Sequence, residues 1–118
     1  MFPAENIRDW RGHKVVDSRG SKIGELEAIY VDTASDEPAF ATVKVGVLGR
    51  SRLIFVPLHD AVVAPGYLKV AVTKAQTKTA PSIGTDGELF SEMEPEVFTH
   101  YEIPYRPGTG GERRLARR

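Results

Sequence analysis

The chain has 118 residues, of which 41% are hydrophobic and 27% charged, a composition that fits one globular domain. It contains no cysteine, so disulfides, thiolate metal sites and thiol nucleophiles are excluded and a reducing compartment is favoured. The chain start lacks the basic residues and apolar run of a signal peptide, and no apolar stretch approaches the roughly 20 residues that cross a bilayer, so we expect a soluble cytoplasmic protein.

The charge is unevenly distributed, although the formal net charge is zero. The last 13 residues hold five arginines and one glutamate, so the first 105 carry 11 basic and 15 acidic side chains, a net charge of −4. A nucleic-acid-binding face needs lysines and arginines clustered on folded structure. An acidic body with a basic tail therefore argues against a nucleic-acid-binding surface.

The first part of the chain, residues 7–73, is rich in short β-strand signals punctuated by turn residues. A turn at residues 17–20 follows Val15 and Val16, Gly24 marks a bulge or bend in a long strand, and Pro65-Gly66 is typical of a hairpin. The predicted strands lie at about 15–16, 22–32, 39–47, 53–56, 61–63 and 67–73. About six short strands with no helical repeat between them predict a small β-barrel, because closure removes the exposed edges of the sheet.

Residues 74–105 form the second part of the chain, a polar connector over 74–81 that leads to a short helix. Ser91 and Glu94 resemble a capping box, although Pro95 can instead open the helix. Val97 and Tyr101, four residues apart, give the helix an apolar stripe that can lie on the barrel.

Four segments follow from these patterns. We predict an N-terminal lead over residues 1–6, a barrel over 7–73, a helical extension over 74–105, and a disordered basic tail over 106–118, in which glycine, proline and arginine predominate.

The sequence offers no grouping of residues that indicates catalysis or metal binding. His13, His59 and His100 lack metal-ligand spacing, and we expect adjacent His59 and Asp60 to point to opposite sides of an extended chain. The acidic cluster at residues 32–37 is typical of a solvated turn. We therefore expect no catalytic residue, no metal, no cofactor and no small-molecule substrate, and we predict that the protein is not an enzyme.

The strands at 39–47 and 53–56 carry more valine, isoleucine and phenylalanine than one small interior can easily use. Exposed apolar surface of this kind usually marks an interface, and a symmetric homodimer is the commonest way to cover it. The candidate partner contacts are Phe40 or Phe55 at the centre, with Arg50 and Arg52 at the rim. The alternatives are that both phenylalanines belong to the core and that the two arginines are solvated.

Several short motifs, in this order and spacing, resemble the PRC-barrel domain, which is named after the cytoplasmic domain of the photosynthetic reaction centre H subunit. They are Asp9-Trp10-Arg11-Gly12, Val15-Val16-Asp17, Gly20-Ser21-Lys22-Ile23-Gly24, Ile29-Tyr30-Val31-Asp32, Ala41-Thr42-Val43, the glycines of 46–49, and Phe55-Val56-Pro57-Leu58. The resemblance covers about residues 7–105, and the part after residue 80 is similar to the extension of bacterial PRC-barrel proteins, notably actinobacterial ones.

The resemblance implies a mainly β fold, a small PRC-type barrel with a short C-terminal helix, and no shared catalytic residues. It implies a protein-interaction adaptor whose partner is another protein or a second copy of the chain. Because the family includes the C-terminal domain of the ribosome maturation factor, the alternative is an RNA- or ribosome-associated factor that uses the basic tail with Arg50 and Arg52.

Overall fold

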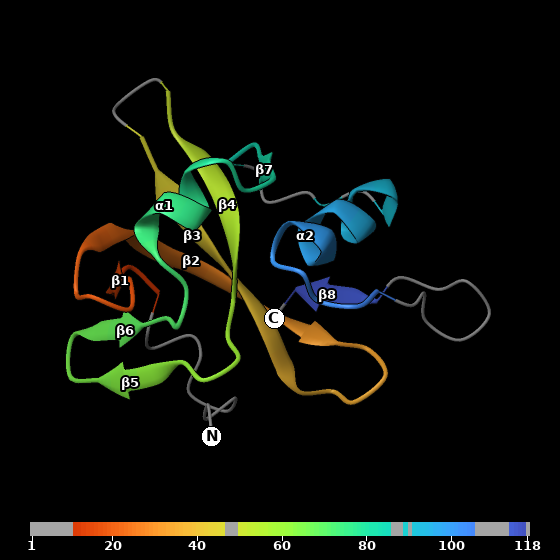
Figure 1. Cartoon of the computed structure of the whole chain (residues 1–118), viewed down its shortest axis with the longest axis horizontal. Helices are drawn as coiled ribbons and strands as arrows, with labels where there is room; N and C mark the ends of the chain where they lie inside the picture. The colour runs from red at the N-terminus through yellow and green to blue at the C-terminus, as the bar shows by residue number, and fades with distance from the viewer. Residues whose placement is uncertain (1–10, 47–49, 86–88, 90, 106–113, 118) are drawn as a thin grey trace.

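The computed structural model describes residues 11–46, 50–85, 89, 91–105 and 114–117. Within them the chain forms eight strands, two short α-helices and a 3-10 turn (Figure 1). In chain order the elements are β1 (Lys14–Val16), β2 (Lys22–Asp32), β3 (Pro38–Val45), β4 (Arg52–Pro57), β5 (Val62–Ala64), β6 (Tyr67–Lys69), α1 (Lys74–Lys78), β7 (Ser82–Ile83), η2 (Ser91–Met93), α2 (Glu94–His100) and β8 (Leu115–Arg117).

All eight strands belong to one sheet with the order β5-β6-β1-β2-β3-β4-β7, and β8 pairs with β2. Every pairing is antiparallel except that of β1 with β6. The two outermost strands, β5 and β7, are not paired with each other, so the sheet is curled but open. The mainly β fold is confirmed, whereas the prediction of about six strands in a closed barrel is corrected to an open sheet of eight strands within the described residues.

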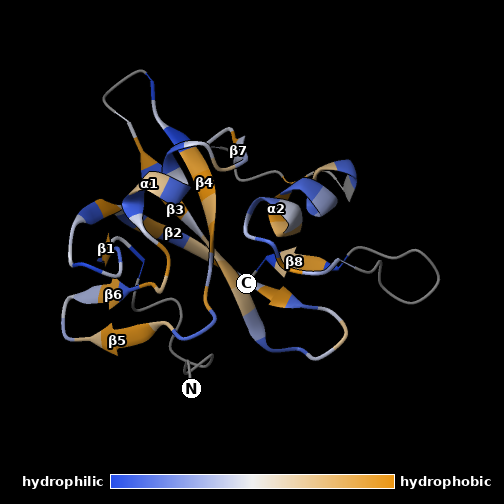
Figure 2. Ribbon diagram, viewed as in Figure 1, coloured by the Kyte–Doolittle hydropathy of each residue, from blue (hydrophilic) through white to orange (hydrophobic). Residues whose placement is uncertain are grey.

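The central strands bury both of their faces, which explains why the sheet does not close around a single interior. Along β4, Ile54 and Val56 point to one hydrophobic cluster, and Leu53 and Phe55 point to another on the opposite face. All four side chains are at most 2% exposed. A strand buried on both faces is a near-continuous apolar run, as β4 is (Figure 2).

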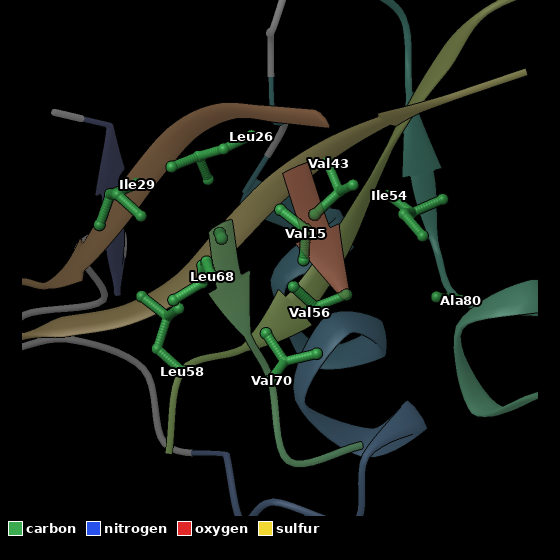
Figure 3. Close-up of a cluster of buried hydrophobic side chains, with 11 residues drawn as sticks. Val15, Leu26, Ile29, Val43, Ile54, Val56, Leu58, Leu68, Val70 and Ala80 are labelled. Atoms are coloured by element: carbon green, nitrogen blue, oxygen red, sulfur yellow. The ribbon is translucent and has the colours of Figure 1, made fainter. Parts of the chain in front are cut away.

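The first core lies inside the curl of the sheet, where side chains from β1, β2, β3, β4 and β6 point toward one another (Figure 3). Its buried members are Val15, Leu26, Ile29, Ala41, Val43, Ile54, Val56, Leu58, Leu68, Val70 and Ala80. The second core lies on the other face, beneath α2, β7 and β8. Its buried members are Ala28, Tyr30, Phe40, Leu53, Phe55, Ile83, Leu89, Val97, Phe98 and Leu115.

Strand β2 contributes to both cores, and its pairing is irregular at three places, one of them between Tyr30 and Val31. The register with β3 shifts between Leu26 and Ala28, which puts Leu26 in the first core and Ala28 in the second. The register with β1 shifts at Ile23, directly before Gly24. A Cβ atom on Gly24 would lie 2.8 Å from Cγ1 of Val43 and nearer still to the carbonyl oxygen of Lys44, so the backbones approach closely here.

The sequence does not predict helix α1, and for helix α2 the structure shows which residue begins it. Helix α1 occupies part of the segment predicted as a polar connector, and it begins with a capping box: the N–H of Gln76 donates to Oγ1 of Thr73 at 3.2 Å, and the N–H of Thr73 donates to Oε1 of Gln76 at 2.8 Å. Helix α2 begins at Glu94, and its N-cap residue Met93 forms no side-chain hydrogen bond, while Ser91 begins the preceding 3-10 turn η2. Pro95 lies in the first turn as the second residue, so neither alternative describes the start as expected.

Residues 114–117 consist of β8 and the residue before it. The prediction of a disordered tail is therefore corrected for these four residues. Leu115 is fully buried in the second core and pairs with Asp32 of β2. Arg117 forms an ion pair of 2.5 Å with Glu27. One apolar side chain that fits into the core thus orders a segment whose composition is otherwise polar. Residues 106–113 and 118 lie outside the described part of the chain.

Candidate functional site

A groove of about 1050 Å³ opens at the end of the sheet where β3 begins and β4 ends. It is bordered by the β2–β3 turn, the turn after β4, and the end of α2. Aromatic rings form its floor and carboxylates its rim: Phe40, Phe98 and Tyr101 on the floor, and Asp36, Glu37 and Asp60 on the rim. We call this feature the acidic groove.

The rim is built by two tight turns that carry acidic residues in a left-handed backbone conformation. Asp36 has a φ of 59°, and its N–H donates to the carbonyl oxygen of Asp32 at 2.6 Å. Asp60 has a φ of 60° in the turn that the N–H of Ala61 closes onto Leu58 at 3.0 Å. Aspartate tolerates this conformation better than most residues, which accounts for its use at both corners.

The second turn also overturns an expectation about His59 and Asp60. Because the chain turns here, Nε2 of His59 lies 3.3 Å from Oδ2 of Asp60, and the two side chains do not point to opposite sides. Both side chains are mostly exposed, at 87% and 76%. Water screens such a pair, so it is a weak surface contact at the groove rim.

The floor of the groove is held rigidly by aromatic contacts. The rings of Phe40 and Phe98 meet nearly edge to face, with centroids 5.1 Å apart, and Tyr101 lies 6.4 Å from Phe40. The hydroxyl of Tyr101 donates to the carbonyl oxygen of Phe55 at 2.6 Å. Burial raises the pKa of Tyr101, so this hydroxyl keeps its proton and remains a donor.

One wall of the groove is an arginine. Nε of Arg114 donates to Oδ1 of Asp32 at 2.7 Å, and its guanidinium lies 5.8 Å from the centroid of the Phe98 ring. The hydrogen bond from Arg114 lowers the pKa of Asp32, so the pair stays charged. The groove thus contains a guanidinium seated between a carboxylate and an aromatic face.

The four predicted partner-contact residues are not brought together. Phe40 borders the groove but is only 1% exposed, and Phe55 is fully buried in the second core. Arg50 and Arg52 are exposed in the β3–β4 hairpin, at the end of these strands opposite the groove. The expectation of one patch centred on the phenylalanines is therefore corrected, because the second core takes up their apolar surface.

The sequence pattern indicates some groove residues only as turn residues and gives no signal for others. The acids of the β2–β3 turn stood out as a cluster, but nothing in the pattern places them beside Asp60. The sequence does not indicate the role of Arg114, because its segment has no strand periodicity. Trp10, in the first of the motifs that resemble the PRC-barrel domain, lies outside the described residues.

His100 connects the helices α1 and α2. Nε2 of His100 lies 2.6 Å from the carbonyl oxygen of Gln76, which links α2 to α1. Across the described ranges, histidine, aspartate and glutamate do not gather in any group of three or more that could hold a metal ion. In the same ranges, every helix is too short or too polar to cross a membrane.

Comparison with known proteins identifies the family. The sequence profile of the PRC-barrel domain matches residues 3–77, which is more than half of the chain and includes β1 to β6. No curated protein matches the chain. The curled sheet that holds the first core is thus the matched part, and the chain belongs to the PRC-barrel domain family.

Proposed function

We propose that this PRC-barrel protein is a non-catalytic protein-interaction adaptor and that its partner docks in the acidic groove. The observation that carries the proposal is the groove itself: an open hollow whose partly exposed apolar lining, which includes the Tyr101 ring, lies beside charged side chains. Protein-binding surfaces commonly place aromatic anchors at the centre and polar groups at the rim.

The titratable groups with shifted pKa values support a role other than catalysis. Backbone N–H groups, above all that of Lys74, lower the pKa of Asp17, and Arg114 lowers that of Asp32. Burial raises the pKa of Tyr105, whose hydroxyl donates to Glu94 at 3.1 Å. Each of these groups has a structural partner that accounts for its shift, whereas a catalytic acid or base is tuned toward a substrate.

A protein partner is favoured over RNA because of the charge at the groove. Asp36, Glu37 and Asp60 stand at the rim, where they repel phosphate. Arg50 and Arg52, the two arginines of the RNA hypothesis that lie on the described body, are at the other end of the β3–β4 hairpin. The absence of cysteine supports our further proposal of a cytoplasmic location.

A homodimer has less support than a partner in the groove. The large hydrophobic side chains that the described residues expose are Val62 at 58% and Tyr67 at 37%. Both lie in the β5–β6 hairpin, at the edge of the sheet. This is a small apolar surface for a stable dimer, which typically buries about 800 Å² on each partner.

Affinity capture with the full-length protein tests the proposal. The variant Glu37→Lys reverses one rim charge, and Arg52→Glu reverses one charge at the opposite end of the same hairpin as the matched control. We expect the same protein to be enriched from native cells by the wild type and by Arg52→Glu and to be lost with Glu37→Lys. Equal recovery by all three forms, or no enriched protein, would contradict docking in the groove.

A further inference from the structure

The acidic groove holds a basic side chain of its own in a defined arrangement. The guanidinium of Arg114 is hydrogen-bonded to the carboxylate of Asp32 at 2.7 Å and faces the ring of Phe98 at 5.8 Å. A planar guanidinium binds well where a carboxylate and an aromatic face occur together, because it can form directed hydrogen bonds and stack at once. Arg114 occupies this arrangement itself, so an incoming basic side chain would meet the remaining carboxylates of Asp36, Glu37 and Asp60.

The other charged side chains of the lining are mainly acidic. Four carboxylates line the groove, those of Asp32, Asp36, Glu37 and Asp60, and among the described lining residues Arg114 is the one with a permanent positive charge. Since Arg114 is bonded to Asp32, the lining keeps an excess of three negative charges with His59 neutral. A concave surface lined by one sign of charge concentrates its field and attracts the opposite charge.

The groove also has an apolar lining beside its acidic rim, so a well-matched ligand should carry an apolar group as well as a positive charge. Phe40, Phe98 and Tyr101 form the floor, and Pro57 and Leu58 border it. Phe40 and Phe98 are already covered, at 1% and 3% exposed, so the apolar lining that still meets water includes the partly exposed Val72, Tyr101 and Ile103. A ligand with charge alone would leave this surface in contact with water, whereas one that also carries an apolar side chain would cover it. The two features lie side by side, so one short segment can satisfy both.

We propose that the acidic groove binds a basic segment of a protein partner, with an arginine or lysine at the rim carboxylates and a neighbouring apolar side chain on the partly exposed apolar lining that includes Tyr101. This inference rests on the proposed docking function and names the chemistry of the docked segment. The rim carboxylates and the apolar lining together select against acidic segments and against nucleic acid.

Peptide titration of the full-length 15N-labelled protein, followed by NMR, tests the inference directly. The probes are three short peptide pools of the same apolar residues, flanked by arginine, by its neutral isostere citrulline, or by glutamate. We expect the arginine pool to shift the amide signals of Glu37, Phe40 and Tyr101. The citrulline pool should bind more weakly and the glutamate pool least, and added salt should weaken the arginine pool because the rim is exposed.

Two variants test whether the arginine pool binds at the rim carboxylates. Glu37→Lys should weaken the arginine pool by roughly two- to five-fold, as the loss of one exposed ion pair allows, and by more if the new charge repels the peptide. Arg52→Glu should leave the affinity unchanged, since Arg52 lies at the opposite end of the hairpin.

The possible failures separate the two proposals. Equal binding of glutamate and arginine pools in the groove would overturn the basic-segment inference and leave the docking function standing. A lack of groove shifts with every pool would also overturn the inference, while the capture experiment judges the docking function on its own. Shifts confined to other surfaces, together with partner capture that Glu37→Lys does not change, would overturn both.

Discussion

Glu94 and Leu115 lie 21 positions apart, yet the buried carboxylate of Glu94 accepts the backbone N–H of Leu115 at 2.9 Å. The same carboxylate accepts the N–H of Arg114 at 2.8 Å and the hydroxyl of Tyr105 at 3.1 Å. A buried carboxylate is costly unless donors satisfy it, and here three donors do so. The contact therefore fixes β8 to the start of α2 and makes the two elements one structural unit.

Replacing Glu94 should loosen that unit. Glu94→Ala leaves the N–H groups of Arg114 and Leu115 without their acceptor, and each orphaned buried donor costs on the order of 1–3 kcal/mol. Glu94→Gln keeps one oxygen acceptor and should cost less. Chemical denaturation measures the loss of stability, and hydrogen exchange should show faster exchange of the Leu115 amide. An amide of Leu115 as protected in Glu94→Ala as in the wild type would contradict this role.

The C-terminal strand should contribute to stability through one side chain. Leu115→Ala removes a fully buried leucine from the second core and should cost about 2–5 kcal/mol. Arg117→Ala, the control, breaks only a partly exposed ion pair with Glu27 and should cost about 1 kcal/mol or less. Thermal and urea unfolding of both variants provide the comparison. Equal stability of Leu115→Ala and Arg117→Ala would mean that β8 is not part of the folded core.

Much of the sheet could be predicted from the sequence because its signals are local. The long strand over residues 22–32 is bounded by a turn on each side, and its predicted limits are those of β2. Pro65-Gly66 marks the hairpin between β5 and β6 for the same reason, since turn chemistry acts within a few residues.

The elements that escaped prediction depend on distant contacts. Leu115 is one apolar residue among arginines, and its strand forms because β2 and Glu94 supply partners far away in the chain. The acids at positions 36 and 60 are visible as turn residues, but only the fold brings the two turns to one groove. The apolar surplus of β3 and β4 predicts an interface, whereas in the structure it fills a second core, which the sequence cannot indicate without the topology.

Gly24 should tolerate no side chain. An added Cβ would contact the carbonyl of Lys44 and lie 2.8 Å from Cγ1 of Val43. Because β2 is paired on both sides, the backbone cannot easily move away, and Gly24→Ala should destabilise the fold by about 1–3 kcal/mol or more. Gly20, with a φ of 87° and open space around it, is the control: Gly20→Ala should cost only the roughly 1–2 kcal/mol of left-handed backbone strain. Urea unfolding ranks the two, and a Gly24→Ala variant as stable as the wild type would refute the close approach.

Asp17 should make stability depend on pH in the acid range. Its carboxylate accepts the N–H groups of Arg19, Ser21 and Lys74, at 2.9, 2.8 and 2.9 Å, and so connects the β1–β2 turn to the start of α1. These bonds, that of Lys74 first, lower its pKa from the ordinary value of 3.8. The folded state therefore binds the proton more weakly than the unfolded state.

The sign of the effect follows from that difference. The stabilisation by Asp17 is fully present above the unfolded pKa of 3.8 and is lost as the pH falls through the lower pKa of the folded state. Asp17→Asn should lower the urea midpoint near neutral pH, and the difference from the wild type should shrink as the carboxyl is protonated. Urea midpoints at about pH 7, 5 and 3 measure it. Val62→Ala, the control, changes an exposed residue that does not titrate, so its urea midpoint should differ from that of the wild type by the same amount at every pH. An equally constant difference for Asp17→Asn would show that the charge of Asp17 does not stabilise the fold.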